Sequence, residues 1–294
     1  MISKPLPALR GVRLLSLALN LPGPAALMRL HALGAKCTKL EGPAGDPMGH
    51  YKKAAYAQMH DGIKIVQADL KSATGQSTLH ALLLKTDVLL TSFRPSALVK
   101  LGLGPADIRK KYPQLNVVAI VGSHGIRAEE PGHDLTYLAE HGLVTGLDLP
   151  ATLYADMAGS LLAVEAVLGA VLAQRARPGA QTPKGSWQEV ALSEAARYVA
   201  LPRTWGLTLP SGSVGGAHPG YRVYPCKDGR VAVAALEPHF AQSLCAIAGV
   251  PLQQPLDLLR PATQKAIAAF LARQSRADLN RLAAQHDIPF FCMK

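Results

Sequence analysis

Short apolar runs alternate with segments of helical spacing along the first 200 residues. The runs that predict buried strands cover residues 12–17, 36–40, 87–91, 116–121 and 187–191, and helical spacing covers residues 25–33, 79–84, 105–112 and 157–175. Strands that alternate with helices are typical of parallel βαβ units. We therefore predict an α/β fold built on a Rossmann-like open parallel sheet.

The pattern changes beyond residue 200. Pro, Gly and Ser recur throughout residues 201–220, which predicts an extended linker. Tyr221–Tyr224 and Val231–Ala235 flank the turn sequence Lys227-Asp228-Gly229, as in a β-hairpin, and the chain after Glu237 has a helical pattern. The predicted parts are a large Rossmann-like domain over residues 1–200, a linker over 201–220 and a small α+β domain over 221–294.

The chain is strongly basic, with 31 Lys and Arg against 20 Asp and Glu and a net charge of +11. Such a surplus attracts anions. The densest basic clusters, Lys52-Lys53 and Arg109-Lys110-Lys111, are not interleaved with the aromatic residues that stack on bases, and no zinc-finger, RRM or KH signature occurs. Nucleic acid is therefore a weak alternative to a ligand that carries a polyphosphate, and we expect no nucleic-acid partner.

Cysteine spacing and hydropathy indicate a reducing compartment without a membrane. The four cysteines are Cys37, Cys226, Cys245 and Cys292. They lie far apart without a C-x-x-C pair, which argues against a metal site or a disulfide framework. The N-terminus lacks a signal-peptide pattern, and the most apolar stretch, Met157–Ala173, carries Glu165 at its centre. We expect a cytoplasmic protein with a buried core helix at this stretch and no bound metal.

The first strand–helix turn argues against a bound nucleotide cofactor. It contains Pro22-Gly23-Pro24 in place of G-x-G-x-x-G, and no P-loop occurs anywhere in the chain. The predicted fold therefore carries no nicotinamide or nucleoside-triphosphate site with it. We expect no permanently bound cofactor.

Three acidic or imidazole side chains stand at predicted helix starts. His133 precedes an apolar helical segment and can exchange protons near neutral pH, although Asp134 as a helix cap beside a surface His133 is the more common arrangement. Asp156 comes directly before the long apolar helix, where it either caps the helix or meets a ligand. Glu237 stands between a strand and a helix. On the residues alone, capping is favoured for both aspartates and for Glu237.

The order and spacing of these passages resemble a known enzyme family. G-H-D-x-x-Y at 132–137, A-D-x-x-G at 155–159 and A-x-E-P-x-F at 235–240 resemble the alpha-methylacyl-CoA racemases, within the class III CoA-transferase group. The resemblance begins at Leu21-Pro22-Gly23-Pro24, includes Phe93-Arg94-Pro95 and ends around Asp287-Ile288-Pro289. It implies an acyl-CoA thioester as substrate, with coenzyme A as part of that substrate, and an interlocked homodimer.

The resemblance also assigns roles to individual residues. His133 and Asp156 match the two acid/base groups of the racemases, and Glu237 matches the glutamate that assists the histidine. In the interlocked dimer, His133 and Asp156 come from one large domain and Glu237 from the small domain of the partner. The residues implied in binding are Gly132, Asp134 and Tyr137 at the acyl-CoA substrate and the basic Arg94 and Lys64 at the CoA phosphates.

The racemase chemistry suits these residue types. Inverting a 2-methylacyl thioester requires removal of the α-proton on one face and return of a proton on the other, so two groups in opposite protonation states must flank the carbon. Glu237 would stabilise the imidazolium that forms when His133 takes the proton. We expect backbone amides near the start of the Met157 helix to stabilise the enolate oxygen.

Two alternatives remain open from the sequence. In a CoA-transferase, Asp156 would be a nucleophile that forms an acyl anhydride and then an aspartyl-CoA thioester. Those enzymes usually lack the histidine, so His133 and Glu237 favour the racemase. The other alternative is a catalytically weakened CoA-binding homologue, because the loop 121–130 is charged where the family has a glycine-rich loop, and the chain is C-terminally shortened, ending at Lys294.

Overall fold

The structure is a computed structural model that describes residues 6–176, 184–251 and 258–294. The chain divides into two compact units, Met1–Ala200 and Leu201–Lys294, and each is described by itself. Residues 252–257, which belong to the predicted helical stretch after Glu237, lie outside the described residues.

The first unit contains a six-stranded, wholly parallel sheet with the order β3-β2-β1-β4-β5-β6. Its strands are β1 (Arg13–Ser16), β2 (Lys36–Glu41), β3 (Lys64–Gln67), β4 (Val88–Thr91), β5 (Asn116–Val121) and β6 (Trp187–Ala191). The chain runs outward from β1 to β3, then returns to the middle and runs outward the other way from β4 to β6. This is the doubly wound order, so the predicted Rossmann-like parallel sheet is confirmed.

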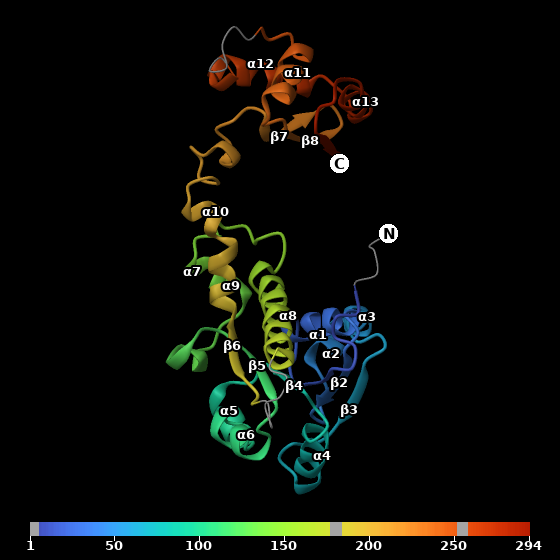
Figure 1. The fold of residues 1–294 in the computed structure, drawn as a ribbon. Coiled ribbons are helices and arrows are strands. Elements are labelled where there is room, and N and C mark those ends of the chain that lie inside the picture. The colour runs from blue at the N-terminus through green and yellow to red at the C-terminus, as the bar shows by residue number, and fades with distance from the viewer. Residues whose placement is uncertain (1–5, 177–183, 252–257) are drawn as a thin grey trace. The chain divides into compact units, whose positions relative to one another are not determined.

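Helices cover both faces of this sheet (Figure 1). One face packs against α1 (Pro22–Ala32), α7 (Asp134–Glu140), α8 (Tyr154–Arg175) and α9 (Leu192–Val199), and the other against α4 (Ala73–Leu83), α5 (Pro95–Lys100) and α6 (Pro105–Lys111). Neighbouring strand residues alternate between the faces: Leu14 packs with α1 and α8, whereas Leu15 packs with α4 and α5. The short helices α2 (Pro47–Tyr51) and α3 (Lys53–Met59) follow β2.

Helix α8 has the length and composition of a membrane span, and it is the one such helix among the described residues. Its small and branched side chains, including Ala163, Val167 and Val171, are buried in the core that α1 and α9 share with the sheet. The predicted core helix therefore describes α8 better than a membrane span does.

The second unit contains a three-stranded antiparallel sheet in the order β7-β8-β9. Its elements are α10 (Leu201–Thr204), η2 (Ser213–Gly215), β7 (Tyr221–Cys226), β8 (Gly229–Ala234), α11 (Pro238–Ile247), α12 (Pro261–Ala272), α13 (Arg276–His286) and β9 (Phe290–Met293). The predicted hairpin is present as β7 and β8. The wholly helical pattern predicted after Glu237 is wrong at its end, because Asp287 in the left-handed conformation terminates α13 and β9 then pairs with β8. Residues 201–220, predicted as an extended linker, include α10 and η2.

Candidate active site

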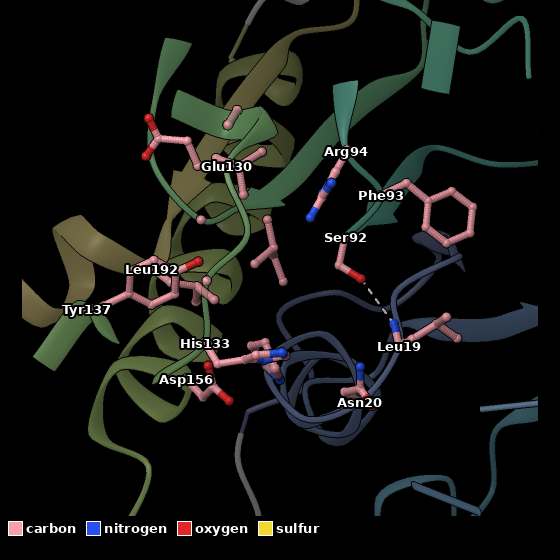
Figure 2. Close-up of a pocket in the computed structure, with 16 residues that line it drawn as sticks. Leu19, Asn20, Ser92, Phe93, Arg94, Glu130, His133, Tyr137, Asp156 and Leu192 are labelled. Atoms are coloured by element: carbon pink, nitrogen blue, oxygen red, sulfur yellow. Dashed lines mark hydrogen bonds between the residues drawn. The ribbon is translucent and has the colours of Figure 1, made fainter. Parts of the chain in front are cut away.

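A pocket opens at the carboxyl ends of the central strands of the first unit (Figure 2). Its lining residues are Leu19, Asn20, Pro22, Ser92, Phe93, Arg94, Ile120, Val121, Gly122, Ala128, Glu130, Gly132, His133, Tyr137, Asp156 and Leu192. They come from the loops that follow β1, β4 and β5 and from α7, α8 and α9. Since the strand order reverses between β1 and β4, this is the crevice where doubly wound sheets bind ligands. Its volume of about 180 Å³ admits a reacting group and a short chain.

His133 is the N-cap residue of α7 and lines the pocket. The Thr136 side chain fixes its backbone: the His133 amide donates to Thr136 Oγ1 at 3.2 Å, and the Thr136 hydroxyl donates to the His133 carbonyl at 2.7 Å. The imidazole lies beside Asp156 at the rim (Figure 2). The structure therefore gives His133 both a capping position and a place at the pocket.

Asp156 lies inside the first turn of α8, two residues after the helix begins at Tyr154. The prediction that it precedes the helix as its N-cap is wrong, because Leu153 is the N-cap residue. The Asp156 carboxyl lines the pocket instead. Burial, the largest cause, and the negative charge of Asp134 raise its pKa, the charge of His133 lowers it, and the resulting pKa is about 6. Asp156 can therefore gain or lose a proton near neutral pH.

Asp134 connects His133 and Asp156. Its buried side chain is 4% exposed, and its Oδ1 accepts the Asp156 backbone amide at 3.0 Å. The next amide, that of Met157, donates to the Leu153 carbonyl at 3.0 Å. These two amides near the start of the Met157 helix are thus occupied, so neither is free to stabilise an enolate oxygen.

Tyr137 places a buried hydroxyl in the pocket wall between two glycines. A Cβ atom at Gly122 or at Gly132 would lie 2.4 Å from the Tyr137 hydroxyl oxygen, so both positions need glycine to admit the ring. Burial raises the pKa of Tyr137, with a smaller contribution in the same direction from the charge of Asp156. The hydroxyl therefore stays protonated and can donate a hydrogen bond.

Arg94 enters the pocket from the loop after β4, with its guanidinium directed into the cavity (Figure 2). A second hollow shares Phe93 with the pocket and is lined by Lys71 and Lys100. Lys64, in contrast, begins β3 at its amino end, and the structure does not bring it to the pocket. Lys71, the last residue of the sequence Ala68-Asp69-Leu70-Lys71, was not among the residues predicted to bind CoA.

A network of buried charged side chains holds the turn after β1. This network was not predicted from the sequence. Asn20 has φ +64°, and its amide donates to both carboxylate oxygens of Asp46 at 3.2 Å. The fully buried ammonium of Lys39 pairs with Asp46 and lies 3.2 Å from Glu41 Oε1. The network thereby fixes a backbone segment that lines the pocket.

Glu237 belongs to the second unit, where it is the exposed N-cap residue of α11. Its side chain makes no cap hydrogen bond. Within the described ranges, no group of three or more His, Cys, Asp and Glu side chains is arranged to hold a metal ion.

Fold and pocket together define a doubly wound α/β protein with an imidazole, a carboxyl of raised pKa and a guanidinium at its switch point. The model of the CoA-transferase family III matches residues 9–293, so the chain belongs to this family.

Similar proteins include both activities of the family. A probable fatty acyl-CoA transferase of Mycobacterium tuberculosis is 30% identical over 279 residues, covering 85% of this chain and 71% of the relative. The human alpha-methylacyl-CoA racemase is 29% identical over 293 residues, which cover 92% of this chain and 74% of the racemase. The crystal structure of the mycobacterial protein superposes with a TM-score of 0.81 at 26% identity, covering 99% of this chain and 86% of that one. The relatives of this chain therefore include both a CoA-transferase and a racemase.

Proposed function

We propose that this protein epimerises 2-methylacyl-CoA thioesters by abstracting and returning the α-proton. The observation that carries the proposal is the presence of His133 and Asp156 in one pocket, with the pKa of Asp156 raised to about 6. Two-base catalysis needs one protonated and one deprotonated group, each with a pKa near the working pH. The Asp156 carboxyl meets the pKa requirement, and the His133 imidazole is the second proton-transfer group.

In one direction, the neutral His133 imidazole takes the α-proton, and the electron pair of the broken C–H bond moves into the thioester carbonyl. The protonated Asp156 carboxyl then delivers its proton to the opposite face, which leaves an imidazolium and a carboxylate. The reverse direction exchanges these roles. The Tyr137 hydroxyl replaces the occupied amides as the donor to the enolate oxygen. In the proposed homodimer, Glu237 from the small domain of the partner would stabilise the imidazolium.

The CoA portion is assigned to the neighbouring basic surface. Arg94 would bind the diphosphate, since a guanidinium makes paired hydrogen bonds to phosphate oxygens. The adjoining hollow, with a volume of about 800 Å³ and lysines 71 and 100 in its lining, offers room and charge for the rest of the nucleotide. Gly132 lines the pocket on the acyl side, and Asp134 acts behind the wall, where it accepts the Asp156 amide. Lys64 has no part in this assignment.

The alternative function is CoA transfer through Asp156, which the similarity to the probable fatty acyl-CoA transferase of Mycobacterium tuberculosis favours. The Asp156 carboxylate would attack the thioester carbonyl and expel CoA as thiolate, which leaves a mixed anhydride. The thiolate would then attack the aspartyl carbonyl, release the acid and form an aspartyl-CoA thioester. This route uses the carboxylate in its ionised form and gives the imidazole of His133 no role.

We also propose that the protein acts in the cytoplasm as a homodimer. Exposed apolar side chains follow one side of α8 at Tyr154, Met157, Leu161 and Leu172, as on a helix that meets another chain. Sedimentation velocity tests the oligomeric state, and a monomer at micromolar concentration would count against the homodimer.

The deciding experiment is incubation of the protein with a 2-methylacyl-CoA in heavy water. We expect deuterium at the α-carbon, and loss of incorporation in both His133→Ala and Asp156→Ala. His124→Ala is the matched control, because this exposed histidine pairs with Glu189 and does not line the pocket. Absence of deuterium, together with transfer of CoA to an added carboxylic acid that survives in His133→Ala, would replace the racemase by the transferase.

A further inference from the structure

The segment 125–130 connects the two sides of the pocket. It contains the short 3-10 helix η1 (Gly125–Glu129), in which Ala128 is buried against Ala119, Val121 and Ala191 and also lines the pocket. The burial of Ala128 fixes the helix on the sheet. The side chains on either side of Ala128 then point to different neighbours.

On one side, Glu129 caps the helix that follows Arg94. Arg94 is the N-cap residue of α5, and its side chain makes no cap hydrogen bond, because a guanidinium has donors only. The Ser96 amide donates instead to Glu129 Oε1 at 2.6 Å, and the Ser96 hydroxyl donates to Glu129 Oε2 at 2.9 Å. A negative charge at a helix N-terminus is also electrostatically favourable. Glu129 thus supplies the cap that Arg94 cannot.

On the other side, Arg127 joins the segment to α7. Its Nε donates to Glu130 Oε2 at 3.0 Å, and one terminal nitrogen donates to Glu140 Oε1 at 2.9 Å. Helix α7 begins directly after His133. The segment 125–130 is therefore tied to the loop of Arg94 through Glu129 and to the helix that follows His133 through Arg127.

We propose that Glu129 is a positioning residue for Arg94: it holds the Phe93-Arg94-Pro95 turn so that the guanidinium meets the phosphates of the substrate. The inference rests on the proposed CoA binding by Arg94. Within the described chain, no hydrogen bond or ion pair of the Arg94 side chain is found, so the backbone turn is the part of Arg94 that such contacts hold in place. Glu129 does not line the pocket and acts on the ligand only through this turn.

The test compares two ligands that differ in their phosphates. Binding of acyl-CoA and of the matching acyl-pantetheine thioester, which lacks every phosphate, is measured for the wild type, Glu129→Ala and Glu129→Gln. We expect Glu129→Ala to weaken acyl-CoA binding about fivefold, equivalent to the ~1 kcal/mol typical of a lost cap, and to leave acyl-pantetheine binding unchanged. Glu129→Gln retains a carbonyl acceptor, so its affinity for acyl-CoA should lie between those of the wild type and Glu129→Ala.

A double variant separates positioning from general damage. In an Arg94→Ala background the turn no longer carries a guanidinium, so adding Glu129→Ala should have no further effect on acyl-CoA binding. Asp107→Ala serves as the matched control, since this acid lies in the first turn of another short helix, α6, and lines neither hollow.

The outcomes distinguish this inference from the proposed function. Equal weakening of both ligands by Glu129→Ala, or full additivity with Arg94→Ala, would overturn the positioning role. Normal acyl-CoA binding by Glu129→Ala, in a protein where Arg94→Ala weakens it, would also overturn it. A wild type that binds no acyl-CoA would refute the proposed function, and the role of Glu129 toward CoA with it.

Discussion

Replacing the reactive carboxyl should stabilise the fold while it abolishes activity. Asp156→Asn keeps the size and shape of the side chain but removes the charge that burial and Asp134 disfavour. In the wild type, the folded state holds the Asp156 proton up to about pH 6, whereas the unfolded chain releases it near 3.8. The folded state therefore binds more protons between these values, and wild-type stability falls as pH rises through this window.

The size of the effect follows from the two pKa values. The interval from 3.8 to about 6 corresponds, at 1.36 kcal/mol per pH unit, to about 3 kcal/mol. The carboxyl is partly exposed to the pocket, and solvent screening reduces this figure. We expect the free energy of unfolding of Asp156→Asn to exceed that of the wild type by about 1–2 kcal/mol at pH 7.5. The gain should shrink as pH falls below 6 and vanish below 3.8.

Urea unfolding of the full chain at pH 4, 5, 6 and 7.5 measures this difference. Asp61→Asn is the matched control, because this exposed aspartate lies in the same unit and does not line the pocket. Its free energy of unfolding should depend on pH as that of the wild type does. An Asp156→Asn protein that is less stable than the wild type at pH 7.5, or equally more stable at every pH, would show that the carboxyl is not held in an unfavourable environment.

Three further variants test the surrounding residues. Asp134→Asn keeps an acceptor for the Asp156 amide but removes a like charge, so the pKa of Asp156, read by carboxyl NMR titration, should fall. Lys39→Met leaves Asp46 buried without its cation, so urea unfolding should show a loss of about 3–5 kcal/mol, which Asp46→Asn partly restores. Tyr137→Phe should slow α-proton exchange about 100-fold with little change in KM, if its hydroxyl donates to the enolate oxygen.

Most of the parallel sheet could be predicted from the sequence because its central strands are buried on both faces. The predicted residues 116–121 coincide with β5, which is buried along its whole length. Residues 187–191 coincide with the edge strand β6, where Trp187, Val190 and Ala191 supply the apolar run. Strand β3 was missed because it is an exposed edge strand, with Lys64 and Gln67 at its ends, and it lacks the apolar run that marks a buried strand. Strand β9 follows a helix so closely that only its pairing with β8 reveals it.

The site was less accessible to sequence reasoning than the fold. Local patterns indicated helix starts at His133 and Asp156, and only the family resemblance joined the two residues into one site. Their shared pocket depends on the reversal of strand order between β1 and β4 and on the hydrogen bond from Asp156 to Asp134, neither of which is local. Lys64 is a second example. The resemblance implied that it binds a CoA phosphate, but the structure places it at the amino end of the edge strand β3.

The carboxylates of the first unit have two kinds of environment, and the difference separates Asp156 from Asp46 and Glu41. Asp46 and Glu41 share the ammonium of Lys39, and the network holds a turn. Asp156 lies beside another carboxylate, Asp134, and in the described residues it has no Lys or Arg partner within ion-pair distance. A buried carboxyl paired with a cation gains stability and loses basicity, whereas one left beside a like charge keeps a proton near neutral pH at a cost in stability. Such a cost is retained where the proton is used.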